Sequence, residues 1–157
     1  MKKTLHILLA FAMLFSLTAT AFAASSPLVI GDAIREEVPS SDNQAIQPLS
    51  WGGAAAQVTK IELYNAYIDA ENHLFVLLKV TGYGHDTTYF NGKLVTSTMV
   101  GSFTLDGGPG ADGFIWSYDC GEITEPGVYT FSTVYTSTNH PYSQKSAAWK
   151  IPIEAVS

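Results

Sequence analysis

The chain has 157 residues, with 14 acidic against 8 basic side chains and a formal net charge of −6. A negatively charged surface repels phosphate backbones and anionic lipid head groups, so this balance argues against nucleic acid and the membrane surface as partners. Cys120 is the single cysteine, so no internal disulfide can form and an apolar core must hold the fold.

The N-terminus has the three parts of a secretory signal peptide. Lys2 and Lys3 form a positive start, residues 5–17 are almost entirely apolar, and Ala21-Phe22-Ala23 is a small-x-small cleavage site. The apolar run is shorter than the ~20 residues of a comfortable membrane span. We therefore predict a signal peptide over residues 1–23, a secreted product and no membrane insertion after cleavage, which leaves 6 basic against 14 acidic residues.

Residues 24–56 differ in composition from the rest of the chain. They are rich in Ser, Pro, Gly and charged residues, with few large apolar side chains spaced to form one face. We interpret them as a flexible arm or linker, in which residues 28–30 are the one piece able to pair with a sheet edge. The folded domain is predicted to span residues 57–157.

The first half of this domain reads as extended strands. Residues 58–69 are β-branched and aromatic, and a bulge around Tyr64-Asn65 brings their two apolar phases onto one face; a helix is the competing interpretation. Residues 74–80 are almost continuously apolar, which predicts a central strand covered on both faces. Residues 82–86 are predicted to form a loop. Asn91-Gly92 then predicts a tight hairpin, because both residues accept positive φ.

The second half continues the strand pattern. We expect a strand over residues 93–105, a glycine-rich loop, and a strand over 114–119 that turns its aromatic side chains, including Trp116, into the core. A Pro-Gly turn introduces a long strand over 127–138. The closing strand alternates apolar Trp149, Ile151 and Ile153 with polar residues, and Pro152 within it fits a sheet edge or strand end. Six or seven antiparallel strands with no convincing helix predict an all-β sandwich.

The stretch Pro126-Gly127-x-Tyr129-Thr130-Phe131, followed by the alternation up to Ile153, resembles the end of immunoglobulin-like and polycystic-kidney-disease-type domains of exported bacterial proteins. The resemblance covers about a quarter of the mature chain, and the cysteine pair of antibody domains is absent. It implies an immunoglobulin-like sandwich in which Tyr129 hydrogen-bonds back across a corner. The expected structural residues are Tyr129, Phe131, Trp116 and Trp149. Such domains usually bind, space or display and rarely catalyse.

Aromatic residues on predicted loops and strand ends are candidate ligand-binding residues. Exposed rings stack on sugars in carbohydrate-binding modules and anchor protein interfaces. The candidates are Tyr83, Tyr89, Phe90 and Tyr142, and the alternative is that they belong to the core.

Asp106 and Asp112 flank the glycine-rich loop. Calcium prefers several oxygen ligands, including carbonyls of a winding backbone, so these carboxylates are the candidate calcium ligands; the alternative is a plain flexible connection. No other cofactor is expected. Cys120 reads as a small, half-buried residue at a strand end, with intermolecular pairing as the alternative.

The sequence has no nucleophile elbow, paired carboxylates or phosphate loop. Our hypothesis is a non-catalytic, secreted binding or display module whose partner is a protein or glycan at the cell exterior. The alternatives are a carbohydrate-binding module that uses exposed aromatics and a small secreted metal-binding protein or hydrolase.

Overall fold

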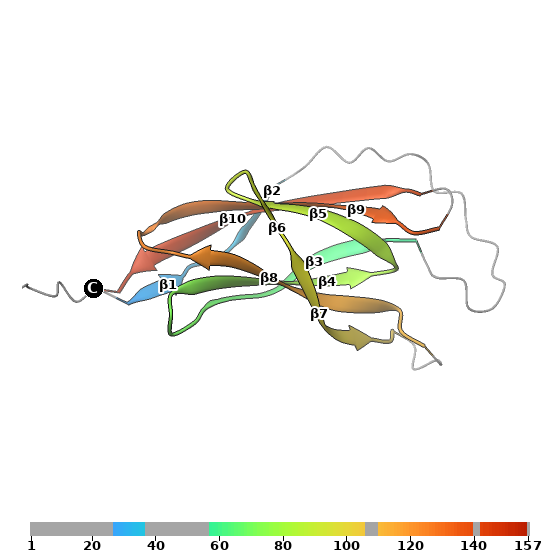
Figure 1. Ribbon diagram of the computed structural model, residues 1–157, viewed down its shortest axis with the longest axis horizontal. Coiled ribbons are helices and arrows are strands. Elements are labelled where there is room, and N and C mark those ends of the chain that lie inside the picture. The colour runs from blue at the N-terminus through green and yellow to red at the C-terminus, as the bar shows by residue number, and fades with distance from the viewer. Residues whose placement is uncertain (1–26, 37–56, 106–109, 140–141, 157) are drawn as a thin grey trace, which may run out of the picture.

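The computed structural model describes residues 27–36, 57–105, 110–139 and 142–156, which form an antiparallel sandwich of two sheets (Figure 1). The predicted signal peptide, most of the predicted arm and Asp106 lie outside the described residues. The all-β prediction is confirmed, and no described residue belongs to a helix. The described part of the chain therefore contains nothing that could serve as a membrane-spanning helix.

Each strand has its hydrogen-bonded neighbours within one of the two sheets. The six-stranded sheet has the order β1 (Leu28–Ile30), β10 (Gln144–Ala155), β9 (Gly127–Ser137), β5 (Gly84–Phe90) and β6 (Lys93–Val95), and β2 (Ile34–Glu36) also pairs with β10. The four-stranded sheet has the order β3 (Lys60–Ile68), β4 (His73–Thr81), β8 (Gly113–Glu122) and β7 (Ser97–Phe103). Orders β3-β4-β8-β7 and β10-β9-β5-β6 have the connectivity of strands A-B-E-D and G-F-C-C′ of immunoglobulin domains.

The described residues form ten strands, so the predicted number of six or seven is wrong. Two additional strands, β1 and β2, come from the predicted arm. A third arises because the single strand predicted over residues 93–105 divides at Thr96 into β6 and β7, which belong to different sheets. Figure 1 shows this segment crossing from one layer to the other. Alternation of side chains continues through such a crossing, so the pattern did not reveal it.

The N-terminal strands border β10, and Pro152 lies at the junction between them. Leu28 to Ile30 pair with Ala155 to Ile153, and Ile34 to Glu36 pair with Lys150 to Ala148. The Pro152 carbonyl accepts a hydrogen bond of 2.9 Å from the Gly31 amide. Because proline has no N–H to donate, the ladder tolerates it where the bordering segment passes from β1 to β2.

Local features of the first strands confirm the sequence interpretation. The register of β3 against β4 shifts between Leu63 and Asn65, which is the predicted bulge. Asn91 and Gly92 both have positive φ, at 46° and 75°, and join β5 to β6 as a two-residue hairpin. The predicted loop over residues 82–86 is wrong in part, because β5 begins at Gly84. His85 is exposed and Asp86 is half-buried on the opposite, inward side of this strand.

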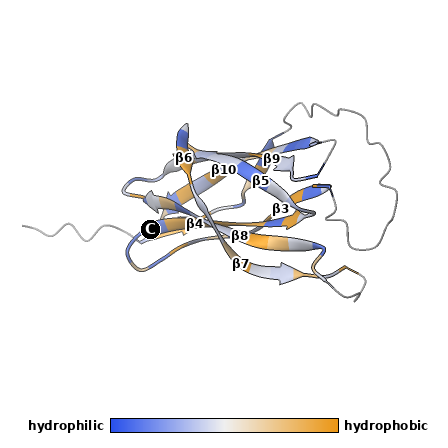
Figure 2. Cartoon of the chain, turned by 45° about the vertical axis from the view of Figure 1, so that its right-hand side comes forward, coloured by the Kyte–Doolittle hydropathy of each residue, from blue (hydrophilic) through white to orange (hydrophobic). Residues whose placement is uncertain are grey.

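The core lies between the two sheets and alternates with solvent-facing positions along each strand (Figure 2). Phe131 and Tyr118 are fully buried, with ring centroids 5.2 Å apart, and Trp149 packs beside Phe131. Trp116 is half-buried and packs against this cluster, so the aromatic face of β8 enters the core as predicted. The remaining core side chains come mainly from β4 and β10, at Leu74, Val76, Leu78, Val80, Ile151 and Ile153.

Tyr129, at the start of β9, makes the contact that the resemblance to immunoglobulin-like domains implies. Its hydroxyl donates a 2.6 Å hydrogen bond to the Glu125 carbonyl, four residues upstream, and its ring stacks on Phe90 at 5.6 Å. A tyrosine that closes the turn into the penultimate strand in this way is the corner found in immunoglobulin sandwiches. The contact holds the crossing from β8 to β9.

Candidate functional site

The four aromatic residues predicted to bind a ligand lie at two separate places. Tyr83 lies between β4 and β5, next to the turn that bears Tyr142, because the Thr138 amide bonds the Tyr83 carbonyl at 3.1 Å. Tyr89 and Phe90 lie at the opposite end of β5. The fold therefore does not bring the four residues together into one binding surface.

Individual surroundings divide these residues further. Phe90 is 7% exposed and stacks on Tyr129, so it is a core residue and presents no ring face to a ligand. Tyr83 is half-buried, donates a 2.7 Å hydrogen bond to the Ala111 carbonyl and packs edge-on against Phe114. Tyr89 and Tyr142 are exposed, at 42% and 59%. The alternative interpretation, a place in the core, holds for Phe90, whereas Tyr83 is half-buried outside the core cluster.

Asp112, one of the two candidate calcium ligands, organises the backbone of its own loop. Its carboxylate accepts a hydrogen bond from the Leu105 amide, its amide donates to the Phe103 carbonyl and its carbonyl accepts from the Gly82 amide. Asp106 lies outside the described residues. Among the residues that are described, no group of three or more His, Cys, Asp or Glu side chains lies close enough to hold a metal ion.

The outer face of the four-stranded sheet gathers apolar side chains that the sequence analysis did not single out. Tyr67 on β3 and Phe75 on β4 are opposite each other, with their rings stacked at 5.2 Å. Leu77 and Ile115 follow on β4 and β8, and Phe103 on β7 completes a diagonal stripe across the sheet. Tyr67 is 43% exposed and the other four are half-buried. We call these five residues the outer stripe.

The outer stripe was not predicted because β4 was expected to be covered on both faces. That expectation is wrong for the described residues. The central position of β4, between β3 and β8, is confirmed. However, its outward residues Phe75, Leu77 and Lys79 alternate with fully buried ones and are themselves half-buried. A continuous apolar run looks the same whether its second face meets another layer or solvent. One residue in the sequence did indicate an exposed face: Lys79 is charged and lies on the same side of the strand as Phe75 and Leu77.

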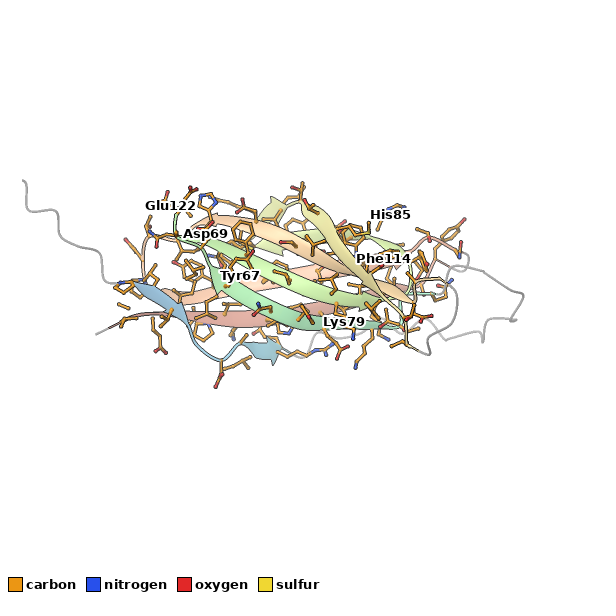
Figure 3. The ribbon with its side chains drawn as sticks, turned by 90° about the horizontal axis from the view of Figure 1, so that it is seen from below. Tyr67, Asp69, Lys79, His85, Phe114 and Glu122 are labelled. Atoms are coloured by element: carbon orange, nitrogen blue, oxygen red, sulfur yellow. The ribbon has the colours of Figure 1, made fainter. Side chains whose placement is uncertain are left out.

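Charged groups surround the outer stripe. The Lys79 ammonium lies 4.4 Å from the centre of the Phe103 ring, a cation–π contact. Lys60 and Glu62 form an ion pair of 2.8 Å, and the hydrogen bond from Lys60 is the main cause that lowers the pKa of the Glu62 carboxyl. Toward the other end, His73 Nδ1 and Asp119 Oδ1 are 3.4 Å apart. Figure 3 shows Tyr67 and Lys79 on this face of the sheet.

Phe103 can lie across the end of β8 only because Gly113 has no side chain. A Cβ atom at this position would collide with the Val80 carbonyl oxygen and with the Phe103 ring. The close approach of an aromatic ring to a backbone is a common reason for glycine within a strand. Gly113 therefore helps to place the last residue of the outer stripe.

A hydrogen-bonded network of hydroxyl groups joins the two sheets inside the sandwich. Asp86 Oδ2 accepts from Thr88 Oγ1 at 2.7 Å and from the Tyr118 hydroxyl at 3.0 Å, and Oδ1 accepts from Ser97 Oγ at 3.1 Å. Thr88 in turn contacts the Thr133 hydroxyl at 2.7 Å, and the Tyr118 and Tyr135 hydroxyls are 2.6 Å apart. Both threonines and both tyrosines are at most 1% exposed.

This network consists of partnered groups. In the described residues, every buried side-chain nitrogen or oxygen has a hydrogen-bond partner, so no unsatisfied polar group is directed toward a ligand. A hollow of about 390 Å³, next to Asn72, Glu122 and Thr124, lies at the end of the sandwich where β4 begins and β8 ends. Neither feature has the nucleophile and base arrangement of a hydrolase.

Cys120 is half-buried near the end of β8, in agreement with the sequence interpretation. Burial, and secondarily the Asp119 charge, raises the pKa of its thiol to about 12. We expect the folded protein to react with iodoacetamide at about pH 8 more than ~100-fold more slowly than the urea-unfolded chain, because only the thiolate is nucleophilic. Mass spectrometry of alkylated samples measures both rates, and similar rates would contradict the prediction.

A scan against protein-family models, a search of curated proteins and a search of solved structures each found no match.

Proposed function

We propose that this domain acts outside the cytoplasm as a non-catalytic protein-binding module, and that the outer stripe of the four-stranded sheet is its binding surface. The observation that carries the proposal is the solvent-facing side of β4 and β8, where Phe75, Leu77 and Ile115 take positions that polar residues usually occupy in a two-layer sandwich. An apolar centre with a charged border has the anatomy of a protein interface.

A protein fits this surface better than a glycan. Sugars stack on free aromatic faces, but Tyr67 and Phe75 cover one another and the Lys79 ammonium lies over the Phe103 ring. The centre of the stripe is aliphatic, at Leu77 and Ile115. Aliphatic side chains contribute area to a protein interface and offer a sugar neither a stacking surface nor a hydrogen bond.

The border charges indicate how a partner would be oriented. Asp119 lies beside the Tyr67–Phe75 end of the stripe, whereas Lys79 and Lys60 lie toward the other end. A complementary partner has basic groups opposite Asp119 and an acidic group opposite Lys79, because Lys60 is already paired with Glu62. Such complementarity mainly affects the association rate and the choice of partner.

A pair of matched serine substitutions tests the proposal. Ser117 on β8 and Ser132 on β9 are both half-buried, outward residues of inner strands, one on the outer face of each sheet. Ser117→Lys places a charge between Leu77 and the β7 edge, and Ser132→Lys places the same charge on the opposite face. The secreted chain and both variants are immobilised and exposed to surface and secreted proteins of the source organism and, separately, to a glycan array.

We expect the wild-type chain and Ser132→Lys to capture the same partner protein equally well. Ser117→Lys should bind that protein at least about tenfold more weakly, since hot spots occupy the centre of an interface. Tyr67→Ala should also weaken this capture. Capture that both serine variants leave unchanged would contradict the proposed surface. Glycan binding that Ser117→Lys abolishes would replace the protein partner with a carbohydrate.

A further inference from the structure

Strand β7 is an open edge of the four-stranded sheet. It pairs with β8 on one side, and no other described strand lies on its second side. Its backbone N–H and C=O groups on that side therefore have no ladder partner among the described strands. Such a row of groups is a template for pairing with another strand.

This edge has few of the features with which proteins block such pairing. Residues 94–105, from β6 through β7, contain no charged residue and no proline. Met99 and Val100 are 53% and 55% exposed. A bulge at Val100, between Met99 and Gly101, is the one protective device on the strand.

The other edges of the sandwich differ from β7. On β3, Lys60 and Glu62 carry charges, a bulge interrupts the ladder, and β1 contacts the strand. Strands β1, β2 and β6 have three residues each. Short or charged edges discourage strand addition, so β7 is the edge suited to it.

We propose that β7 pairs antiparallel with β7 of a second copy of this chain and joins the two four-stranded sheets into one. A two-fold axis brings the same uncharged segment of each copy together, so no like charges meet across the new ladder. A partner strand of this composition is present in the chain itself. The joined sheets also place the two outer stripes on one continuous face, because Phe103 and Ile115 lie next to this edge.

The charge distribution favours a second copy in this antiparallel orientation. Of the eleven Asp and Glu residues that the structure describes, six lie at one end of the sandwich, at Asp69, Glu71, Asp119, Glu122, Glu125 and Glu154; Figure 3 shows Asp69 and Glu122 together at this end and Lys79 toward the other. Strand β7 pairs with β8 from Tyr118 to Gly113, the half away from the acidic end. Antiparallel pairing there puts the two acidic ends at opposite extremes of the dimer, where repulsion between them is smallest.

Sedimentation of the secreted chain from micromolar to millimolar concentration tests this pairing. Wild type should show a reversible monomer–dimer equilibrium. Val100→Lys should raise the dimer dissociation constant by about tenfold or more, because two lysines then meet near the axis. Thr98→Lys, an exposed substitution on the same strand, should act in the same direction. The matched control is Leu94→Lys on β6, which is 65% exposed and should leave the constant unchanged.

The outcomes separate this inference from the proposed binding surface. A monomer at every concentration, or a dimer equally sensitive to Leu94→Lys, would overturn it. Loss of another protein's binding on Val100→Lys, with no dimer in wild type, would assign the edge to strand addition by that protein. Ser117→Lys changes the outer face of the sheet and leaves the backbone hydrogen-bonding groups of the β7 edge in place. The binding surface and the β7 dimer can therefore fail independently of each other. Circular dichroism confirms that each variant is folded.

Discussion

Asp86→Ala is expected to lower the free energy of unfolding by about 2–4 kcal/mol, although Asp86 is a single half-buried side chain. The carboxylate is the terminal acceptor of two hydroxyl chains, one through Thr88 and one through Tyr118. Removing it leaves these protons without their acceptor inside the sandwich, where an unsatisfied polar group costs about 1–3 kcal/mol. Ser97 also loses its contact near the crossing from β6 to β7.

Urea denaturation of Asp86→Ala, Asp86→Asn and Tyr118→Phe measures this effect. Asp86→Asn keeps one acceptor oxygen, so it should lose less stability than Asp86→Ala. The double variant Asp86→Ala/Tyr118→Phe should be more stable than the sum of the single effects implies, because Tyr118→Phe removes one of the protons left unsatisfied. A coupling energy above about 0.5 kcal/mol is expected for a shared network. Strict additivity, or a loss below ~1 kcal/mol for Asp86→Ala, would show that the network contributes little.

Alkaline solution is expected to unfold this domain through Tyr118 and Tyr135. Burial is the main cause that raises the pKa of both hydroxyls above the ordinary value; the contact with Tyr118 adds to the rise at Tyr135, whereas the hydrogen bond with Tyr135 partly opposes the rise at Tyr118. In the unfolded chain both ionise near the ordinary pKa of ~10. Because the folded-state pKa values are raised, the stabilisation is complete below pH ~10 and is lost as the pH rises toward the folded-state values.

Each tyrosine should therefore reduce the free energy of unfolding by about 1.4 kcal/mol per pH unit above ~10, which amounts to about 4 kcal/mol for both at about pH 11.5. Denaturation at a series of pH values, with tyrosinate absorbance recorded in parallel, gives this slope. In a Cys120→Ser background, which removes the thiol's own contribution to the slope, Tyr118→Phe should roughly halve it. Tyr64→Phe, at an exposed tyrosine of the β3 bulge, is the matched control. An unchanged slope in Tyr118→Phe would contradict the assignment.

Binary alternation predicted most of the fold, because the two faces of a strand meet different surroundings. Tyr129, Phe131, Thr133 and Tyr135 all face inward, as the pattern from the Pro-Gly turn predicts. Asn91-Gly92 predicted its hairpin, and the phase change in β3 predicted its bulge, because each depends on neighbouring residues. The crossing at Thr96 could not be read in this way, because the phase of the side chains does not show which sheet a strand joins.

The candidate site was less predictable than the fold. Tyr83, Tyr89, Phe90 and Tyr142 were selected because loops usually bear binding residues, and Phe90 proved to be a partner of Tyr129 in the core. The outer stripe lies within the strands instead, where an apolar residue normally indicates burial. Asp86, taken for a loop residue, became the acceptor of an internal network only because the fold brings three strands around it.

The amino-acid sequence by itself determined that this chain forms strands, where most of them turn and which side chains form the core, because these properties depend on residues close together along the chain. Only the tertiary structure decided that no described element covers the second face of β4, that Asp86 meets Tyr118 and Ser97, and that no described strand pairs with the outer side of β7. These properties depend on which strands become neighbours in space, and that is settled by packing and hydrogen bonding between segments far apart in the sequence.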